Sequence, residues 1–513
     1  MRSRPLPLLA LVLLAGCIHR FYDTEAGPLE PTAEPVSVDA ALRVHLAGGD
    51  VALFRDGAVV GPDAVEGRGI RYDVARLDSV PVRRVPMDSV IGIESYREEL
   101  NRGKTVAVST AATLGIAALT IACVSECFGS CPTVYTDSAG TELLEAELFS
   151  YSIAPLLEGR DVDVLGTGAR DGVVRLDVRN EAMETHFINH LQLLEVRHAA
   201  DESVAPDLRG LPVAWRGAAA PERAVDGGGR VVLGDVAAAE GRAFATTAVR
   251  LAAVGERDLE DALELTFPRP GAGADSAVLV LDLRNSLLNT VLFYDLMLGA
   301  AGARALDWMG SDLERIGDAV RLGHWWSRRM GLHVSVWREG AWHETARLPD
   351  TGPIAWTRVA IPVPVAHGTE PVRVRLRFPA DAWRIDRVAL ARFRRPEPRP
   401  LKPARLLDVD GVAHDSALEA LAKPDEAYVQ TVAGDRFAVE FDVGPEPATG
   451  ARTFLVSSQG YYTEWVRPAW VRAAGRGETF APSDASLLEA MQRWRGVRAE
   501  FERQFYETRI PAR

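Results

Sequence analysis

Hydrophobic and polar side chains alternate in many short runs along this chain. In residues 372–378 every second side chain is apolar, and the three between them are arginines. Because successive side chains of a strand point to opposite faces, this pattern predicts a half-buried strand with a basic outer face. Similar short runs lie at 42–46, 51–54, 69–74 and 90–94. They predict a small antiparallel sheet or open barrel near the N-terminus, in which Asp56-Gly57 forms a hairpin turn.

A different spacing marks the C-terminal segment. Apolar side chains recur there at steps of three and four residues: Leu487, Met491, Trp494, Val497, Phe501 and Phe505. This spacing predicts an amphipathic helix, and Ser483, which follows Pro482, is its expected N-terminal cap. Such a stripe usually packs on its own domain; the alternative is a helix that binds a partner.

A third pattern is the run 105–124, which carries no charged side chain. A helix of this length can span a bilayer. The run is rich in Ala and Thr rather than Leu, however, so its insertion into a membrane is only marginally favourable. Two interpretations stay open. One is a transmembrane or membrane-dipping helix, and the other is a helix buried by partner domains or by another copy of the chain.

The first 17 residues have the layout of a bacterial secretory signal. Arg2 and Arg4 precede an apolar run that ends in Leu-Ala-Gly-Cys at residues 14–17. This ending resembles the lipobox of bacterial lipoproteins, which implies acylation of Cys17 and a membrane anchor formed by the N-terminal lipid. A plain signal peptide or a short membrane helix is the alternative. Ile18 is not the Asp associated with inner-membrane retention, so the cell envelope, and its outer membrane in particular, is the expected location.

Changes in composition divide the chain into eight segments. They are a signal peptide (1–17), a Pro- and Glu-rich tether (18–38), a small β domain (39–100), an apolar helical segment (101–128), a β module (129–200), a β-sandwich (205–395), a C-terminal β segment (396–475) and a C-terminal helix (476–513). The expected fold class is therefore mainly β, with a small N-terminal antiparallel sheet, a jelly-roll-like sandwich, one apolar helix and one amphipathic helix.

Two stretches resemble a module of exported bacterial proteins. Residues 130–135 read Ser-Cys-Pro-Thr-Val-Tyr, and 180–198 end in Leu-Leu-Glu-Val-Arg-His. The module occurs behind tetratricopeptide or FG-GAP repeats in ASPIC/UnbV-type proteins, and the resemblance covers about residues 129–470. The matching positions are Ser130, Cys131, Pro132, Tyr135, Glu184, His186, Leu193, Leu194, Val196 and His198. The hairpin turn at 137–140 is longer than in that module. The resemblance implies a β architecture and supplies no catalytic residue.

Bulk composition narrows the classes of function. Of the 513 residues, 47% are hydrophobic and 25% charged, as in ordinary globular proteins, and the length predicts several domains. A net charge of −13 argues against nucleic acid as a partner, because phosphates require a basic surface. No nucleophile elbow, phosphate loop or dinucleotide fingerprint occurs in a supporting context, so no cofactor is predicted.

The cysteines and the acidic pairs give weak signals. After Cys17 the chain contains Cys123, Cys127 and Cys131, at intervals that do not match zinc sites. A disulfide between Cys127 and Cys131 or buried thiols are the two interpretations. The pairs at 161/163 and 408/410 have the spacing of calcium ligands but complete no calcium loop, so turns are expected there. His186 and His190 lack the Glu of a zinc-protease motif, and a polar strand face is favoured over a metal site.

Eleven tryptophans lie in the part of the chain after residue 214. Those exposed on the sandwich could stack on sugar rings, whereas aromatic residues in strands more often pack in cores. Trp325, Trp326 and Trp356 are the candidates for an exposed ligand-binding face, and Trp337 and Trp383 are expected to point inward.

These patterns favour a non-catalytic lipoprotein of the cell envelope that acts as a scaffold or adhesion module for a protein or glycan partner. The first alternative is a carbohydrate-binding protein that uses the exposed tryptophans. The second is a hydrolase, which would need two carboxyl groups about 5–10 Å apart in a cleft.

Overall fold

The computed structural model describes residues 35–39, 41–46, 51–54, 56–72, 79–96, 131–138, 140–153, 155–182, 184–238, 243–253, 259–271, 275–293, 316–366, 369–425, 427–431, 434–464 and 483–507. The chain forms two compact units; the described part of the first lies within 35–96 and that of the second within 131–507. The predicted apolar helix at 105–124 lies outside the described residues, as do Cys17, Cys123 and Cys127.

The first unit is a seven-stranded antiparallel sheet in the order β1-β4-β5-β3-β2-β7, with β6 paired to β5. The strands are β1 (Val36–Val38), β2 (Ala41–Leu46), β3 (Val51–Phe54), β4 (Ala58–Val60), β5 (Ala64–Tyr72), β6 (Ser79–Pro86) and β7 (Val90–Tyr96), with a 3-10 turn, η2, at Met87–Ser89. Alternate residues of these strands, such as Leu42, Val44 and Phe54, are fully buried in one cluster. The predicted N-terminal sheet is confirmed.

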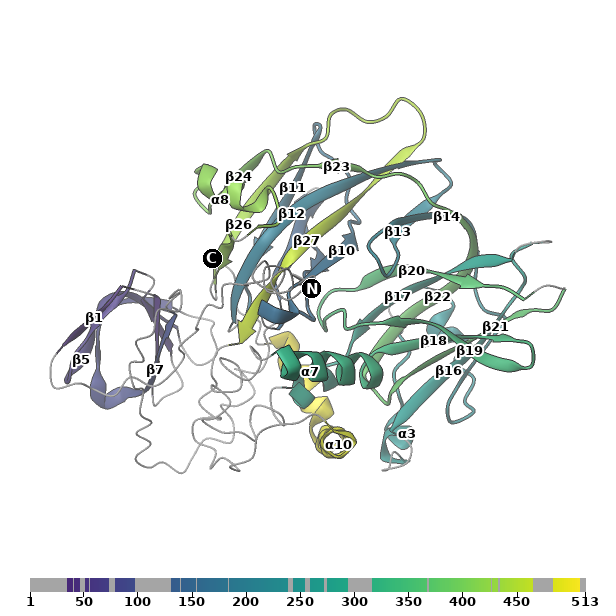
Figure 1. Cartoon of the computed structure of the whole chain (residues 1–513), viewed down its shortest axis with the longest axis horizontal. Helices are drawn as coiled ribbons and strands as arrows, with labels where there is room; N and C mark the ends of the chain where they lie inside the picture. Colours follow the sequence, from purple (N-terminus) through teal and green to yellow (C-terminus); the bar gives the residue numbers. More distant parts are fainter. Residues whose placement is uncertain are drawn as a thin grey trace, which may run out of the picture. The chain divides into compact units, whose positions relative to one another are not determined.

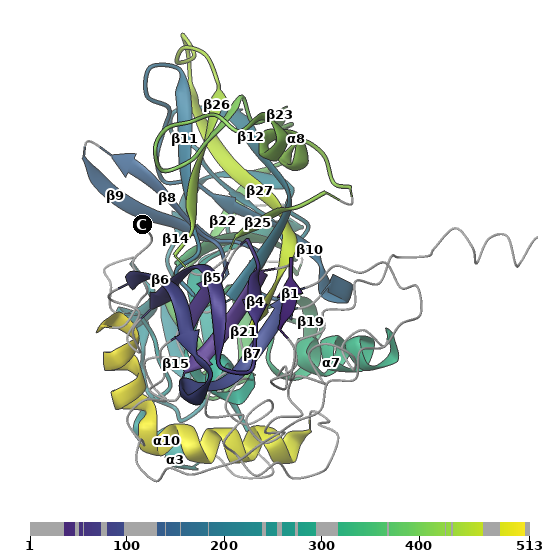
Figure 2. The same ribbon diagram turned by 90° about the vertical axis from the view of Figure 1, so that its left-hand side faces the viewer.

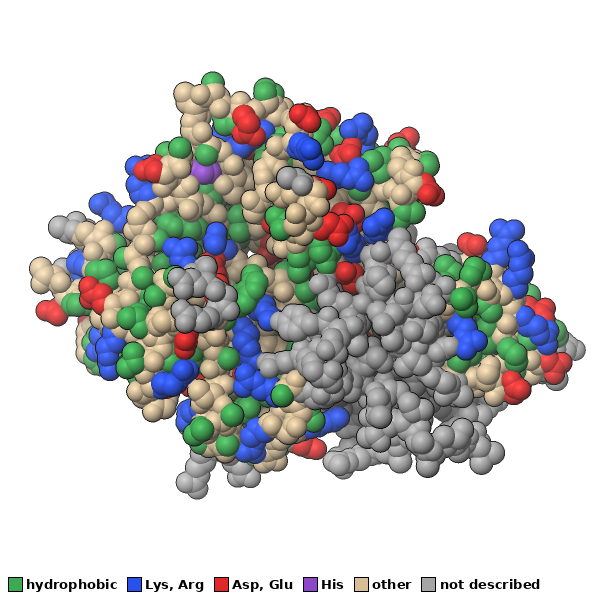
Figure 3. Space-filling model, turned by 180° about the vertical axis from the view of Figure 1, so that it is seen from behind, with side chains coloured by type: hydrophobic (Ala, Val, Ile, Leu, Met, Phe, Trp, Pro, Cys, Tyr) green, Lys and Arg blue, Asp and Glu red, His purple; other side chains and the backbone are tan. Residues whose placement is uncertain are grey.

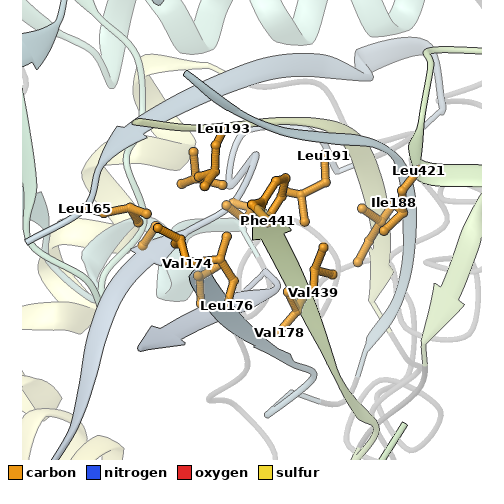
Figure 4. Close-up of a cluster of buried hydrophobic side chains, with 14 of the residues drawn as sticks. Leu165, Val174, Leu176, Val178, Ile188, Leu191, Leu193, Leu421, Val439 and Phe441 are labelled. Carbon is orange, nitrogen blue, oxygen red and sulfur yellow. The ribbon is translucent and has the colours of Figure 1, made fainter. Parts of the chain in front are cut away.

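The second unit contains a β-sandwich that we call the host sandwich. Its strands are β8 (Thr133–Ser138), β9 (Thr141–Glu147), β10 (Gly159–Val164), β11 (Val173–Arg179), β12 (Glu184–His198), β23 (Arg399–Leu401), β24 (Arg405–Leu407), β25 (Val429–Thr431), β26 (Arg436–Asp442) and β27 (Ala451–Glu464). They form two sheets, β10-β27-β12-β23 with β25 on β12, and β24-β26-β11-β8-β9. Side chains of both sheets, including Leu176, Leu191 and Phe441, pack together in one buried cluster (Figure 4).

Two further five-stranded sheets form the inserted sandwich, in the orders β13-β14-β22-β17-β20 and β15-β16-β21-β18-β19. The strands are β13 (Ser203–Pro206), β14 (Pro212–Ala219), β15 (Arg223–Asp226), β16 (Glu260–Phe267), β17 (Ser276–Asn285), β18 (Leu332–Arg338), β19 (Ala341–Leu348), β20 (Thr357–Pro364), β21 (Val372–Pro379) and β22 (Trp383–Arg394). In β21 the valines, Leu376 and Phe378 are buried while the arginines between them reach solvent, as predicted.

The two sandwiches do not follow one another along the chain as the expected series of segments would. β12 pairs antiparallel with β27 along its whole length, from Glu184 opposite Glu464 to His198 opposite Ala451. The expected segments 129–200 and 396–475 therefore share the same sheets, and the sandwich between them is an insertion (Figure 1). Alternation reveals that a segment is a strand, but it does not reveal which distant strand pairs with it.

The described residues contain many strands and few helices, so the fold is mainly β, as predicted. The helices are α2 (Leu233–Val236), α3 (Ala248–Ala253), α4 (Leu288–Thr290), α7 (Ile316–Arg329), α8 (Asp415–Leu421) and α10 (Asp484–Glu507), with a 3-10 turn, η3, at Pro155–Leu157. None of these described helices combines the length and the apolar character that crossing a membrane requires.

The C-terminal helix α10 confirms the amphipathic pattern. Its predicted cap is observed, because Ser483 Oγ accepts a hydrogen bond from the backbone N–H of Ser486 at 3.2 Å. Within the stripe, Trp494 is fully buried and donates from Nε1 to Asp381 Oδ2 at 2.5 Å. α10 therefore packs on the inserted sandwich of its own chain, beside α3 (Figure 2).

Candidate functional site

A cavity of about 220 Å³ lies in the second unit, where the host sandwich, the inserted sandwich and helix α7 meet. Its walls are mostly apolar and aromatic, with contributions from Leu157 of η3, Leu322 and Trp326 of α7 and Tyr462 of β27. A small apolar cavity with a few polar groups is the usual form of a small-molecule site. Its volume is sufficient for a single aromatic ring with a short substituent.

The carboxyl group of Asp350 forms the polar end of this cavity. Trp326 Nε1 donates to Oδ2 at 2.5 Å, while Asn289 Nδ2 and Asn285 Nδ2 donate to Oδ1 at 3.0 and 3.4 Å. Burial raises the pKa of Asp350 to about 7, and the three donors oppose that rise only in part. Near neutral pH the group is therefore divided between a protonated and an ionised form, so it can donate or accept a hydrogen bond.

Two cavity oxygens have no hydrogen-bond partner among the described residues. They are Oδ1 of Asn289, whose residue is 7% exposed, and Oγ of Ser150. A buried polar atom without a partner costs about 1–3 kcal/mol. A bound molecule with a hydrogen-bond donor would remove that cost, so these atoms favour a ligand that is apolar with at least one donor.

A second pocket, of about 170 Å³, adjoins the cavity and shares Tyr151, Pro349 and Asp350 with it. Asp161 and Asp163 line this pocket from β10, two residues apart and so on one face of the strand. Their expected placement in a turn is wrong, because the segment pairs with β27. Burial raises the pKa of Asp161 to about 6. Burial, with the charges of Asp161 and Glu147, raises the pKa of Asp163 well above its usual value.

Glu147 joins the two sandwiches beside these pockets. Its Oε2 accepts hydrogen bonds from the backbone N–H groups of Ile354 at 2.8 Å and Ala355 at 3.1 Å, in the loop between β19 and β20. Gly352 of the same loop approaches the carboxyl group so closely that a Cβ there would lie 2.3 Å from Glu147 Cδ. This contact fixes the loop that carries Asp350.

The three predicted ligand-binding tryptophans lie in different environments. Trp326 lines the cavity, but Trp325 is only 6% exposed and packs edge-to-face on Trp326 with ring centroids 6.0 Å apart. The expected exposure of Trp325 is wrong, because adjacent residues of a helix point in different directions and one of them faces the protein. Trp356 is exposed at 43%, lies under the Arg284 guanidinium and does not line the cavity.

The two tryptophans expected to point inward also differ from each other. Trp383 is fully buried and its Nε1 donates to the Met330 carbonyl, as predicted. Trp337 is half-buried on the outer face of its sheet, with the Arg373 guanidinium 4.6 Å from its ring centroid. Val336 occupies the inward position of β18, so the residue after it must point outward.

The other residues singled out in the sequence are a cysteine, a histidine and an acidic pair. Cys131 is buried and lines the cavity, while its predicted disulfide partner lies outside the described residues. His186 lies in β12 as expected, and burial lowers its pKa to about 3. Asp408 accepts the backbone N–H groups of Asp410 and Val412, which confirms the turn there. In the described part of the chain, no three His, Cys, Asp or Glu side chains converge in a way that could hold a metal ion.

The polar end of the cavity has no signature in the sequence. Asn285 and Asn289 lie 65 and 61 residues before Asp350, and in the sequence 350–353 looks like an ordinary turn. Only the folded structure brings the three together. Of the residues selected from the sequence, Trp326 and Cys131 line the cavity.

No protein-family model matches this sequence, and a search of curated protein sequences gives no match. Among solved structures, the chain is similar to a GH31 alpha-xylosidase from Xanthomonas citri, with 8% identity over 86% of this chain and 35% of that one, and a TM-score of 0.17. A cycloalternan-forming enzyme from Listeria monocytogenes has 12% identity over 66% of this chain and 30% of its own, with a TM-score of 0.18. The chain thus spans about a third of the length of these enzymes, and similarity this low carries no conclusion about fold or activity.

Proposed function

We propose that this chain is a non-catalytic ligand-binding protein of the bacterial cell envelope, held on the membrane by lipid at Cys17. The observation that carries the binding role is the apolar cavity in which Asn289 Oδ1, beside the fixed carboxyl group of Asp350, has no hydrogen-bond partner among the described residues. The secretory signal with its lipobox-like end supports export and anchoring. Acidic and basic side chains are interspersed on the face in Figure 3, in keeping with a partner other than nucleic acid.

The geometry of the site favours recognition of a small molecule. Trp326, Asn285 and Asn289 hold the Asp350 carboxyl group in one orientation. Apolar walls would cover the body of the ligand, and its donor would pair with Asn289 Oδ1. The ligand class is thus a small, largely apolar molecule with a hydrogen-bond donor.

Binding is tested by titration calorimetry of the full chain with benzyl alcohol and with toluene, which has no donor. For a fragment of this size we expect a dissociation constant on the order of 1 mM for benzyl alcohol and weaker binding of toluene. Gly323→Leu would place a side chain in the cavity from α7, and it should abolish binding. Gly496→Leu is the matched control, because this helical glycine has open space around it. Undiminished binding to the Gly323→Leu protein would refute the assignment of the site.

Anchoring is tested separately in native membranes. Wild-type protein should incorporate a labelled lipid and remain with the membrane fraction, whereas Cys17→Ala should lose the label and be released. A variant that stays in the membrane without the label would contradict a lipid anchor at Cys17. Protease access on either side of residues 105–124 would then show whether that run spans the membrane.

A further inference from the structure

The pocket beside the cavity contains two oxygen atoms that lack a partner in the described part of the chain. Asp163 is 5% exposed, and its Oδ2 accepts no hydrogen bond. Thr351 lines the same pocket, and its buried Oγ1 is likewise without a partner. Both atoms belong to residues that line the pocket, and each can accept a hydrogen bond.

Asp161 and Asp163 of this pocket also have no ion-pair partner among the described residues, whereas Asp207, which lines it too, is paired with Arg395 at 2.8 Å. Asp161 accepts backbone N–H groups of Phe149 and Val162, at 3.0 and 2.9 Å, and no described side chain forms an ion pair with it or with Asp163. The two arginines that line the pocket are directed elsewhere. Arg160 Nε donates to Ser457 Oγ at 3.0 Å, and Arg209 Nη2 lies 3.8 Å from Asp207. Buried carboxyl groups without a cation are costly, and a cationic ligand would relieve that cost.

An organic ammonium group suits this arrangement better than a metal ion. A metal requires several ligands converging at short distances, and the described residues form no such group. An ammonium group needs only hydrogen-bond acceptors for its three donors. Asp163 Oδ2 and Thr351 Oγ1 would provide two of them, and the Asp161 carboxyl group lines the same pocket.

We propose that this pocket binds the primary ammonium group of a ligand whose apolar body occupies the adjoining cavity. The inference rests on the proposed binding function, and it names the ligand class as a small amphipathic amine. Tyr151, Pro349 and Asp350 line both spaces, so the two are neighbours, and the proposed ligand would reach from one into the other.

The test compares benzylamine, which is protonated at neutral pH, with benzyl alcohol, its neutral counterpart of similar shape. Both are titrated calorimetrically into the full chain at pH 8. Because a hydrogen bond to a charged group is stronger than one between neutral groups, benzylamine should bind at least about tenfold more tightly. Asp163→Asn keeps the shape of the side chain and should bring the two affinities to within about threefold of each other. Asp410→Asn, in an exposed turn, is the matched control and should leave the ratio unchanged.

The outcomes separate the two proposals. If benzyl alcohol binds and benzylamine binds no better, the ammonium site is refuted while the cavity remains a binding site. If neither probe binds, both proposals fail. An affinity ratio that survives Asp163→Asn would also overturn the ammonium site, because the preference would then arise outside this pocket. Circular dichroism of the Asp163→Asn protein shows whether a lost preference reflects the pocket or a lost fold.

Discussion

Substituting Gly352 by alanine should disrupt the contact that joins the two sandwiches. The backbone at Gly352 has φ +83°, a left-handed conformation that residues with a Cβ rarely adopt. The new Cβ would lie 2.3 Å from Cδ and 2.4 Å from Oε2 of Glu147. Because these distances are far below a van der Waals contact, the carboxyl group would have to move away from the loop.

The magnitude follows from two costs. The left-handed conformation costs alanine about 1–2 kcal/mol. Displacing Glu147 removes the acceptor of the Ile354 and Ala355 amides, and buried groups left without a partner cost about 1–3 kcal/mol. We expect Gly352→Ala to lower the free energy of unfolding of the second unit by about 2–5 kcal/mol.

Urea denaturation of the full chain, followed by tryptophan fluorescence, measures this loss. The matched control is Gly340→Ala, at φ +78° with no atom within 4 Å of the new Cβ, which should cost only the conformational part. In a Glu147→Ala background the collision partner is gone, so Gly352→Ala should then cost no more than the control. Equal losses for Gly352→Ala and Gly340→Ala in the wild-type background would refute the reasoning.

Three other perturbations test separate parts of the structure. The pKa of Asp350 in the folded protein is raised from 3.8 to about 7, so its contribution to stability is present below pH 4 and is lost as pH rises through 7. The urea midpoint of the wild-type protein should therefore fall between pH 4 and pH 7, and this fall should be absent in Asp350→Asn. An equal fall in both proteins would contradict the burial of the group. Trp494→Phe removes the donor to Asp381 and should lower stability by about 1.5–3 kcal/mol in the same assay, whereas a neutral effect would mean that the bond contributes nothing. Ser483→Ala removes the cap of α10 and should cost about 0.5–2 kcal/mol, seen as faster amide exchange in its first turn but not in the inserted sandwich.

Local patterns in the sequence predict most individual elements of this fold. The alternation in 372–378 and the stripe through Trp494 depend only on neighbours in the chain, and both are found as expected. Which distant strand a given strand pairs with does not depend only on neighbours in the chain. Nothing local in β12 specifies β27 as its neighbour, so the two halves of the host sandwich look like independent segments in the sequence.

The candidate site was even less accessible to prediction. Asp350 resembles a turn residue, and its importance comes from burial against Trp326 and the two asparagines. The orientation of a tryptophan is also a tertiary property, as Trp325 and Trp337 show. Sequence reasoning selected the right residue type on α7 but could not tell which of two adjacent rings faced a cavity.

The pairing of β12 with β27 has a consequence for the order in which the protein folds. His198 and Thr453 are hydrogen-bonded across 255 residues, so the host sandwich cannot close until nearly all of the chain has been delivered. The first strand of the inserted sandwich, β13, and its last strand, β22, both pair with β14, so the two ends of the insertion lie near each other. The inserted sandwich can therefore complete its sheets first. Until β27 arrives, β10 and β12 present unpaired edges that invite association with other chains. A chaperone that covers these edges during this interval would limit such association.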